Sequence, residues 1–182
     1  MSIIKISVIT ITYNAENVIM RTLDSVLKQT FSNIEHIIID GASKDSTLLA
    51  EREYESRSCS TNNGHEIKII SEPDKGLYDA MNKGIGKATG NYLVFLNAGD
   101  VFPSSSTLET VTDMIGDGEE LPGVLFGDTN IVDDNGNFLR HRRLSPPAHL
   151  NWRSFMFGML VCHQAFYART DIAKRNYYDL HY

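Results

Sequence analysis

The chain has 182 residues, a length that suits one domain and can bury a substantial core without disulfides. Its composition, 42% hydrophobic and 22% charged, is typical of a globular protein, and its formal net charge of −6 argues against a nucleic-acid partner, which requires a basic face. The two cysteines, Cys59 and Cys162, lie far apart and show no metal-ligand spacing, so a reduced, cytoplasmic setting fits better than a disulfide framework.

The N-terminus is apolar but has no basic leader and no small-residue cleavage site, which is typical of a strand and not of a signal peptide. No run of about 18 apolar residues predicts a membrane span.

Strands and helices are predicted to alternate over the first part of the chain. A β-branched run predicts a buried parallel strand over residues 4–11, a second buried strand is predicted over residues 34–39, and further strands are predicted over residues 66–71 and 91–96. Helical spacing and capping residues predict helices over residues 14–29, 43–56, 78–88 and 105–115, and residues 58–64 are expected to form a loop. This order predicts an α/β fold with a mostly parallel, doubly wound sheet.

The pattern changes after Pro122. Asp133-Asp134-Asn135-Gly136 separates two strand-like runs and predicts a β-hairpin. The expected elements are strands over 124–132 and 137–142, a short helix near Trp152 and a strand over 162–168. A smaller mixed or antiparallel half is therefore expected to follow the doubly wound half.

Polar side chains collect after each of the four predicted parallel strands. They are Thr12, Tyr13 and Asn14; Asp40 and Asp45; Glu72, Asp74 and Lys75; and Asn97 and Asp100. Because the carboxyl ends of parallel strands share one sheet edge, where ligands bind, this pattern predicts a site. Each loop taken singly is equally consistent with ordinary loop polarity, and Asp45 is equally consistent with a helix N-cap.

No glycine-rich phosphate-binding fingerprint follows the first strand, so phosphate would have to be held by a divalent metal and side chains. Asp100 is the expected ligand, because carboxylate oxygens suit Mg²⁺ and Mn²⁺. The alternative is that Asp100 caps the helix that follows it.

Four motifs carry a resemblance to a known family. They are Val8-Ile9-Thr10-Ile11-Thr12-Tyr13-Asn14, Asp40-Gly41-Ala42-Ser43-Lys44-Asp45-Ser46-Thr47, the stretch from Asp74-Lys75-Gly76-Leu77-Tyr78-Asp79-Ala80-Met81-Asn82-Lys83-Gly84-Ile85 to Gly90, and Leu96-Asn97-Ala98-Gly99-Asp100. In this order they resemble inverting family 2 glycosyltransferases with the GT-A fold, and bacterial surface-polysaccharide enzymes of the colanic-acid type in particular. The match covers about residues 3–103 and extends more loosely to about 169.

The resemblance implies roles for individual residues. The donor-binding residues would be Thr12, Tyr13, Asn14, Asp40, Asp79, Asn82 and Asn97, with Asp40 accepting a hydrogen bond from the base. Asp100 would bind the metal, and His163 and Gln164 would lie on the acceptor side. Asp79 and Asn82 share a helix face and could instead hold adjacent loops; His163 and Gln164 could equally be structural.

Two departures from the family pattern limit these expectations. The family's DxD-type motif usually has more carboxylates, whereas Asn97 and Gly99 leave Asp100 as the motif's only one. Inverting transfer also needs a general base, and neither Asp171 nor Asp179 lies in a matching acidic motif, so the base is expected beyond Tyr182. We therefore expect one GT-A-like domain over 1–182, with a nucleotide-sugar half over 1–103 and an acceptor-side half over 104–182 that is truncated at its C-terminus.

The expected function is metal-assisted, inverting transfer of a sugar from a nucleotide-diphosphate sugar, most simply a UDP-sugar, to a hydroxyl of a saccharide or lipid-linked saccharide in cell-envelope glycan synthesis. Mn²⁺ or Mg²⁺ is the expected cofactor, and the expected location is the cytoplasm, with peripheral association at the inner face of the membrane. One alternative is a nucleotide-sugar-binding module without catalysis. A sugar-phosphate nucleotidyltransferase is a poorer fit, because that class needs a glycine-rich, basic loop after the first strand.

Overall fold

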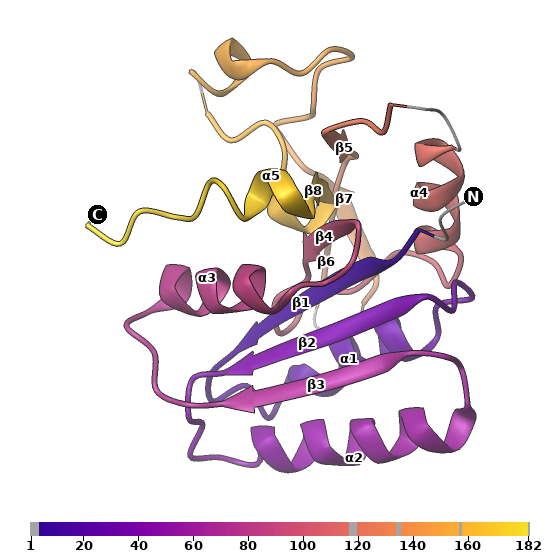
Figure 1. Cartoon of the computed structure of the whole chain (residues 1–182), viewed down its shortest axis with the longest axis vertical. Coiled ribbons are helices and arrows are strands. Elements are labelled where there is room, and N and C mark those ends of the chain that lie inside the picture. The colour runs from indigo at the N-terminus through magenta and orange to yellow at the C-terminus, as the bar shows by residue number, and fades with distance from the viewer. Residues whose placement is uncertain (1–3, 117–119, 134–135, 157, 182) are drawn as a thin grey trace.

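The computed structural model describes residues 4–116, 120–133, 136–156 and 158–181. Its main sheet has six strands in the order β3-β2-β1-β4-β8-β5 (Figure 1). Four of them are parallel: β1 (Ile6–Thr12), β2 (Ile34–Asp40), β3 (Glu66–Ser71) and β4 (Tyr92–Phe95). The predicted α/β fold class is confirmed, and β1 and β2 are buried along their whole length, as β-branched runs with helices on both faces should be.

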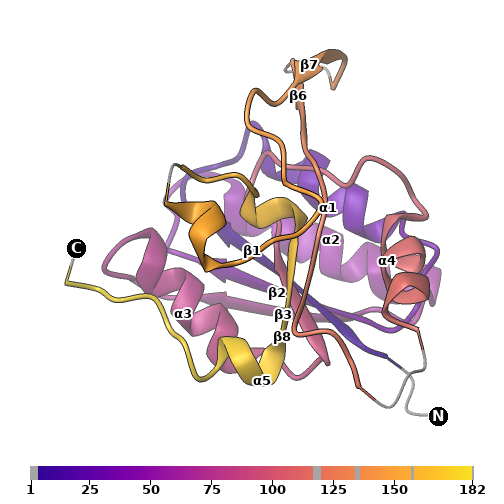
Figure 2. The same ribbon diagram turned by 90° about the horizontal axis from the view of Figure 1, so that it is seen from above.

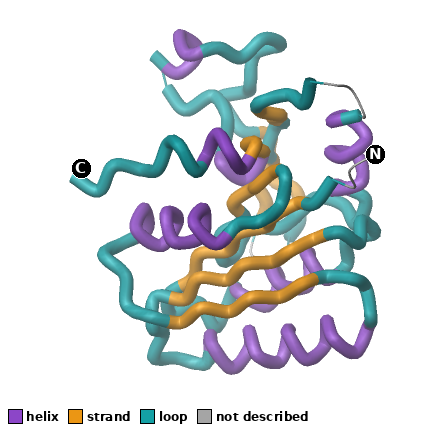
Figure 3. Tube along the Cα trace, in the orientation of Figure 1, coloured by secondary structure: helices purple, strands orange, loops and turns teal. Residues whose placement is uncertain are grey.

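Helices cover both faces of the parallel strands, as Figures 1 and 3 show. On one face lie α1 (Ile19–Leu27), α2 (Thr47–Thr61) and α4 (Thr107–Ile115), packed through residues such as Leu23, Tyr54 and Leu108. On the other face lies α3 (Leu77–Lys87), which packs Ala80, Met81 and Ile85 against β1 and β2. The short α5 (Thr170–Ala173) adds Ala173 to the same face.

The later half of the chain completes this sheet and also forms a separate hairpin. The strands β5 (Val124–Phe126) and β8 (Phe166–Arg169) join the main sheet, with β8 antiparallel to both β4 and β5. The hairpin strands β6 (Asn130–Val132) and β7 (Phe138–His141) pair only with each other in the described structure. Two 3₁₀ turns, η1 (Trp152–Phe155) and η2 (His163–Ala165), precede β8.

Several predicted boundaries were wrong. The first helix begins at Ile19, not at Asn14, because Asn14 has a left-handed backbone and residues 16–18 form a turn. The second helix begins at Thr47 and not at Ser43, and it runs to Thr61 and not to Ser56, with Ser58 buried within it. The predicted loop shrinks to residues 62–65. The predicted strand 124–132 is two strands in different sheets, and residues 163–165 of the predicted last strand form η2. None of the helices in the described ranges is long and apolar enough to cross a bilayer.

A buried polar chain fixes the end of β4. Thr10 Oγ1 donates to the Leu96 carbonyl at 2.8 Å, so it accepts from His36 Nε2, and His36 Nδ1 accepts from the Tyr54 hydroxyl at 2.7 Å. Burial first, and then the charge of His65, lowers the pKa of His36 to about 3, so the imidazole is neutral. This chain holds the carbonyl that immediately precedes Asn97.

The packing of α3 against β1 requires a glycine, and this can be tested. A Cβ on Gly84 would lie 2.5 Å from Ile9 Cγ2. We expect Gly84→Ala to lower the free energy of unfolding by about 1–3 kcal/mol through overpacking. The matched control is Gly86→Ala in the same helix, where the new methyl meets only Tyr177 Oη at 3.6 Å, and we expect it to stabilise by about 0.5–1 kcal/mol. Urea unfolding of both variants measures the difference, and equal effects would contradict the packing argument.

Candidate functional site

The candidate site lies where the strand order changes direction. The chain steps from β1 to β2 on one side, and β4 lies on the other side of β1. The carboxyl ends of these strands are joined edge to edge: Gly41 N donates to the Thr12 carbonyl at 2.9 Å, and Ala98 N donates to the Ile11 carbonyl at 3.2 Å. The structure therefore brings the loops after β1, β2 and β4 together at the kind of switch point where open α/β sheets bind ligands.

The loops after β1 and β2 are tied together by hydrogen bonds. Asn14 has a left-handed backbone (φ 48°), donates through its N–H to Ser43 Oγ at 2.8 Å and accepts from Lys44 N at 2.9 Å. Asp45 accepts from Glu16 N at 3.1 Å and from Thr47 N, the first residue of α2, at 3.0 Å; the N-cap itself is Ser46, whose side chain makes no capping hydrogen bond. Asn14 and Asp45 thus organise the loops.

Two side chains of the first motif differ sharply in exposure. Tyr13 is 59% exposed, with its ring beside Gly41, where a Cβ would lie 3.2 Å from Tyr13 Cδ2. Thr12 is buried, and its Oγ1 has no hydrogen-bond partner among the described residues. The exposed ring is suited to stack on a planar ligand, whereas the Thr12 hydroxyl is enclosed and does not face solvent.

Asp40 is more enclosed than the sequence suggested. Its side chain is fully buried, and its carboxylate accepts from Ser43 N at 3.1 Å, from the Ser43 hydroxyl and from Ser71 Oγ at 2.6 Å. These bonds fasten the ends of β2 and β3. Direct contact between Asp40 and a base requires the Ser43 loop to release the carboxylate.

The two predicted residues of α3 point to different neighbours. Asp79 Oδ2 accepts from Lys75 N at 3.0 Å, within the loop that enters the helix. Asn82 pairs twice with the backbone of Tyr178: its Nδ2 donates to the carbonyl at 2.9 Å, and its Oδ1 accepts from the N–H at 2.8 Å. Asn82 therefore holds the C-terminal segment, the alternative role that the sequence left open.

The loop that carries Asn97 and Asp100 has a backbone only glycine adopts readily. Gly99 has φ +98°, and a Cβ there would also lie 3.2 Å from Arg21 Nη2. Its N–H donates to Thr22 Oγ1 at 2.8 Å, and Asp100 N donates to the Asn97 carbonyl at 2.9 Å. This tight turn explains why a glycine, and not a second carboxylate, precedes Asp100.

The η2 turn packs directly against this loop. Gln164 Nε2 donates to Asp100 Oδ2 at 2.9 Å, and Asn97 Nδ2 donates to His163 Nε2 at 3.1 Å. Residues that the sequence assigned to the donor and acceptor sides thus form one cluster, although more than 60 positions separate them in the chain. An amide nitrogen can only donate, so His163 Nε2 is unprotonated and the ring is neutral.

Burial dominates the electrostatics of the cluster. It raises the pKa of Asp100, against the opposing effects of the Gln164 hydrogen bond and the charge of Arg21. Burial also lowers the pKa of His163, against the charge of Asp100. Asp100 is therefore a carboxylate whose charge lacks full compensation, the condition in which a nearby cation is most favourable.

Two oxygens in the cluster have no donor. Asn97 Oδ1 and Gln164 Oε1 are buried without a hydrogen-bond partner among the described residues. Oxygens of this kind, together with Asp100 Oδ1, suit a hard divalent cation. No group of three or more His, Cys, Asp or Glu side chains in the described chain is arranged to hold a metal, so such an ion would take further ligands from a bound phosphate or from water.

Arg21 and Thr22 belong to the site and were missed at the sequence level. Both lie on α1, and Thr22 is fully buried between Ile19, Leu23 and Val26. A polar residue inside the apolar stripe of a helix was the available signal.

A surface hollow of about 810 Å³ lies at the opposite end of β4, between residues 88–91 and 169–174, and no predicted site residue lines it.

The sheet order, the switch-point loops and the added antiparallel strands define the chain as a GT-A-type α/β protein. The crystal structure of S. aureus TarS 1-349 in complex with UDP-GlcNAc superposes with a TM-score of 0.70 at 23% identity, over 96% of this chain and 48% of that one. A mannosyltransferase from Pyrobaculum calidifontis in complex with GDP-Man and Mn²⁺ superposes with a TM-score of 0.56 at 26% identity, over 68% of this chain and 35% of that one.

The family model for glycosyl transferase family 2 matches residues 7–175, and the chain belongs to that family. A PGL/p-HBAD biosynthesis glycosyltransferase of Mycobacterium bovis is 33% identical over 97% of this chain and 64% of its own length. The amylovoran biosynthesis glycosyltransferase AmsB of Erwinia amylovora is 31% identical over 94% of this chain and 56% of its own. The chain thus spans less than two thirds of these relatives.

Proposed function

We propose that the chain binds a nucleotide-diphosphate sugar, with UDP as the nucleotide, and transfers the sugar to a hydroxyl acceptor with inversion. Family membership supports sugar transfer, and the named activities of the mycobacterial and Erwinia relatives support a role in glycan or polysaccharide synthesis. The UDP-GlcNAc complex of the TarS neighbour has the same fold and agrees with a uridine donor. The expected single domain over residues 1–182, with its donor and acceptor halves, is part of this proposal.

One observation carries the proposal: the η2 turn holds the loop of Asn97 and Asp100 at the switch point of the sheet. The Gln164–Asp100 and His163–Asn97 contacts put one carboxylate and two unsatisfied amide oxygens beside the exposed β1 loop. The exposed ring of Tyr13 would stack on the base.

A divalent cation fits this site, and the mannosyltransferase neighbour holds Mn²⁺ together with its nucleotide sugar. Asp100 would anchor the ion, with Asn97 and Gln164 beside it, and the ion would neutralise charge on the departing diphosphate. Gln164 orients Asp100 by donating to Oδ2, which leaves Oδ1 for the cation. Gly99 permits the turn that aims the carboxylate.

In the transfer step the acceptor oxygen would bond to the anomeric carbon as the bond to the diphosphate oxygen breaks. A carboxylate would take the acceptor proton. Asp171, in α5, is a poor candidate, because it is ion-paired with Arg169 at 2.6 Å and with Arg175 at 2.7 Å. We assign the base to no residue of this chain.

Calorimetric titration of UDP, GDP and dTDP, each with and without Mn²⁺, tests the proposal. UDP should bind most tightly, and Mn²⁺ should strengthen that binding. If none of the three nucleotides binds, the proposal is refuted. If all three bind equally tightly, UDP is not the preferred nucleotide.

A second function, nucleotide-sugar binding without catalysis, is favoured by the ion-paired state of Asp171. It predicts normal UDP binding with no transfer or hydrolysis of a UDP-sugar. Turnover of UDP-sugar by the 182-residue chain would exclude it.

The hydrogen bond from Gln164 to Asp100 gives a sharper prediction. Gln164→Leu keeps the bulk of the side chain but removes the donor, so Asp100 loses its orientation. We expect the Mn²⁺-dependent part of UDP affinity to fall about 10–100-fold, as for other residues that orient a metal ligand. Affinity for UDP without Mn²⁺ serves as the internal control and should stay unchanged; a drop in both would instead indicate collapse of the site.

A further inference from the structure

The helix α2 buries a carboxyl group that the proposed function does not use. Glu51 is fully buried, and neither of its carboxyl oxygens has a hydrogen-bond partner among the described residues. It lies on the same face of α2 as Thr47, Tyr54 and Ser58, the other residues that this helix buries. A polar side chain that is buried without a partner is unfavourable, because nothing compensates the loss of its hydration.

Glu51 lies in the layer between α2 and the sheet. Figure 2 shows α1 and α2 next to each other on the face of the sheet opposite α3. In this layer Tyr54 packs with Ile38 of β2 and with α1, and β3 adds only isoleucines to the cluster. The titratable and charged groups on the elements packed against α2 are His36 and Asp40 of β2, Glu16 and Asp45 of the preceding loops, Asp24 of α1, and Arg52, Tyr54 and Arg57 of α2 itself.

The charges that act most strongly on Glu51 are negative. Burial, and then the charge of Asp40, raise the pKa of Glu51 from 4.5 to about 8. Asp45 adds to this rise, and the exposed guanidinium of Arg52 opposes it. Glu51 is therefore protonated at neutral pH. Loss of its proton would place a second negative charge inside the fold near Asp40, with no donor to receive it.

The loop that closes over Asp40 has a strained backbone. The Asp40 carboxylate accepts from Ser43 N at 3.1 Å and from Ser71 Oγ at 2.6 Å. Ala42, which lies between Asp40 and Ser43, has a left-handed backbone with φ 62°, where the Cβ of an alanine crowds a carbonyl oxygen. Opening of the loop would relieve this strain. The closed and open loops are thus two states whose balance a nearby charge can shift.

We propose that Glu51 is a positioning residue for the donor: in its neutral form it allows the closed loop, and in its ionised form it repels the Asp40 carboxylate and favours an open loop, in which Asp40 accepts a hydrogen bond from the nucleotide base. This inference rests on the proposed function, because the base is the ligand that the open loop receives. Between the ordinary pKa of 4.5 and about 8, the closed form holds a proton that the open form lacks. Each rise of one pH unit in this window therefore favours opening by up to about tenfold.

The Ser43 amide reports the state of the loop without any nucleotide, because it donates to Asp40. Hydrogen exchange followed by NMR should show its protection factor falling about tenfold between pH 6.5 and 8.5 in the wild type. Glu51→Gln keeps the shape of the side chain but cannot ionise, so its protection factor should stay constant. The Gly90 amide, which donates to Glu35 near the start of β2, is the control for general loss of stability and should not show this fall.

Calorimetric titration of UDP without metal measures the effect on donor binding. A nucleotide that binds only the open loop gains apparent affinity as that form becomes populated. Between pH 6.5 and 8.5 the affinity of the wild type should rise about tenfold more than that of Glu51→Gln, since ionisation of the UDP phosphates contributes equally to both. Glu53→Gln, at an exposed position of the same helix, is the matched control and should follow the wild type. Glu51→Leu, which also cannot ionise, serves if thermal unfolding shows that Glu51→Gln does not fold.

The inference is overturned if Ser43 protection has the same pH profile in the wild type and in Glu51→Gln, or if the Gly90 amide loses protection in parallel with Ser43. Either result would leave Glu51 with a structural role alone. It is also overturned if UDP affinity has the same pH profile in both proteins. If the Ser43 amide responds as expected but UDP binds neither protein at either pH, the proposed function fails while the link between Glu51 and the loop stands.

Discussion

Asp100→Ala should abolish the effect of Mn²⁺ on UDP binding. Asp100 is the only carboxylate of its loop, and the two amide oxygens beside it carry no charge. Without the carboxylate, a divalent ion would have neutral ligands and the diphosphate alone. If the metal contributes several kcal/mol to the binding free energy, the Mn²⁺-dependent affinity for UDP should fall on the order of 10²–10³-fold. The rate of sugar transfer should fall by a similar factor.

The matched control is Asp113→Ala, which removes an equally charged but exposed side chain from α4. It should bind UDP like the wild type, with and without Mn²⁺. Calorimetry of both variants in both conditions measures the effect. An unchanged Mn²⁺ response in Asp100→Ala would show that the metal, if bound, is held elsewhere.

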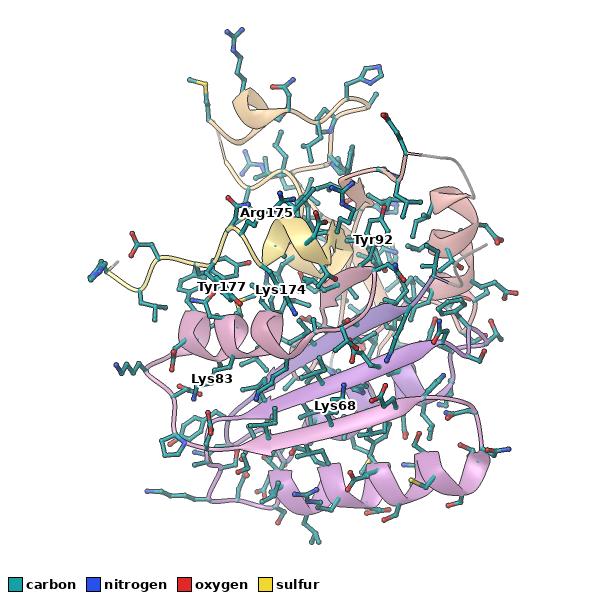
Figure 4. The ribbon with its side chains drawn as sticks, in the orientation of Figure 1. Lys68, Lys83, Tyr92, Lys174, Arg175 and Tyr177 are labelled. Carbon is teal, nitrogen blue, oxygen red and sulfur yellow. The ribbon has the colours of Figure 1, made fainter. Side chains whose placement is uncertain are left out.

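Glu35→Ala should produce the largest loss of stability, about 3–5 kcal/mol, because it leaves a cavity and buried donors such as the Ser7 hydroxyl without an acceptor. Glu35 is fully buried in β2. It accepts from Lys68 Nζ at 2.8 Å, from Thr89 Oγ1 at 2.7 Å and from Gly90 N at 2.8 Å, and it also accepts from Ser7 Oγ. One carboxylate therefore joins β1, β2, β3 and the turn before β4; Lys68 is labelled on β3 in Figure 4.

The stabilisation by Glu35 should depend on pH. Burial alone would raise its pKa, but hydrogen bonds from Lys68, Ser7 and Thr89 outweigh burial and lower the pKa from 4.5 to about 2. Because the pKa of Glu35 is lower in the folded than in the unfolded chain, its ionised carboxylate stabilises the fold at pH values above the unfolded pKa of 4.5. This stabilisation is lost as the pH falls from about 4.5 toward 2. The difference between wild type and Glu35→Gln in urea unfolding should narrow over this range.

The control for Glu35 is Glu66→Ala on β3. Glu66 also pairs with Lys5 and Lys68, but its side chain is 51% exposed, so its removal should change stability by no more than about 1 kcal/mol. Equal losses in Glu35→Ala and Glu66→Ala would mean that the buried hydrogen bonds of Glu35 add nothing.

The sequence by itself determined the parallel half of the fold. The β-branched run at Ile34–Asp40 predicts a buried strand, the run at Glu66–Ser71 forms the partly exposed edge strand beside it, and the polar residues after the two parallel strands must then meet at one edge of the sheet. Asp100 could be identified in the same way, because it is the single acid of the loop that follows the fourth parallel strand. These features are local, because burial pattern and strand direction follow from neighbouring residues.

Only the tertiary structure decided which polar groups meet. Nothing in the local sequence indicates that Gln164 donates to Asp100, that Asn82 holds the backbone of Tyr178, or that Asp40 is closed off by Ser43 and Ser71. The placement of β8 between β4 and β5 brings η2 to the site, and that placement depends on long-range strand pairing. A side-chain amide can pair with any suitably placed donor or acceptor, so its partner is set by the geometry of the fold and not by its own residue type.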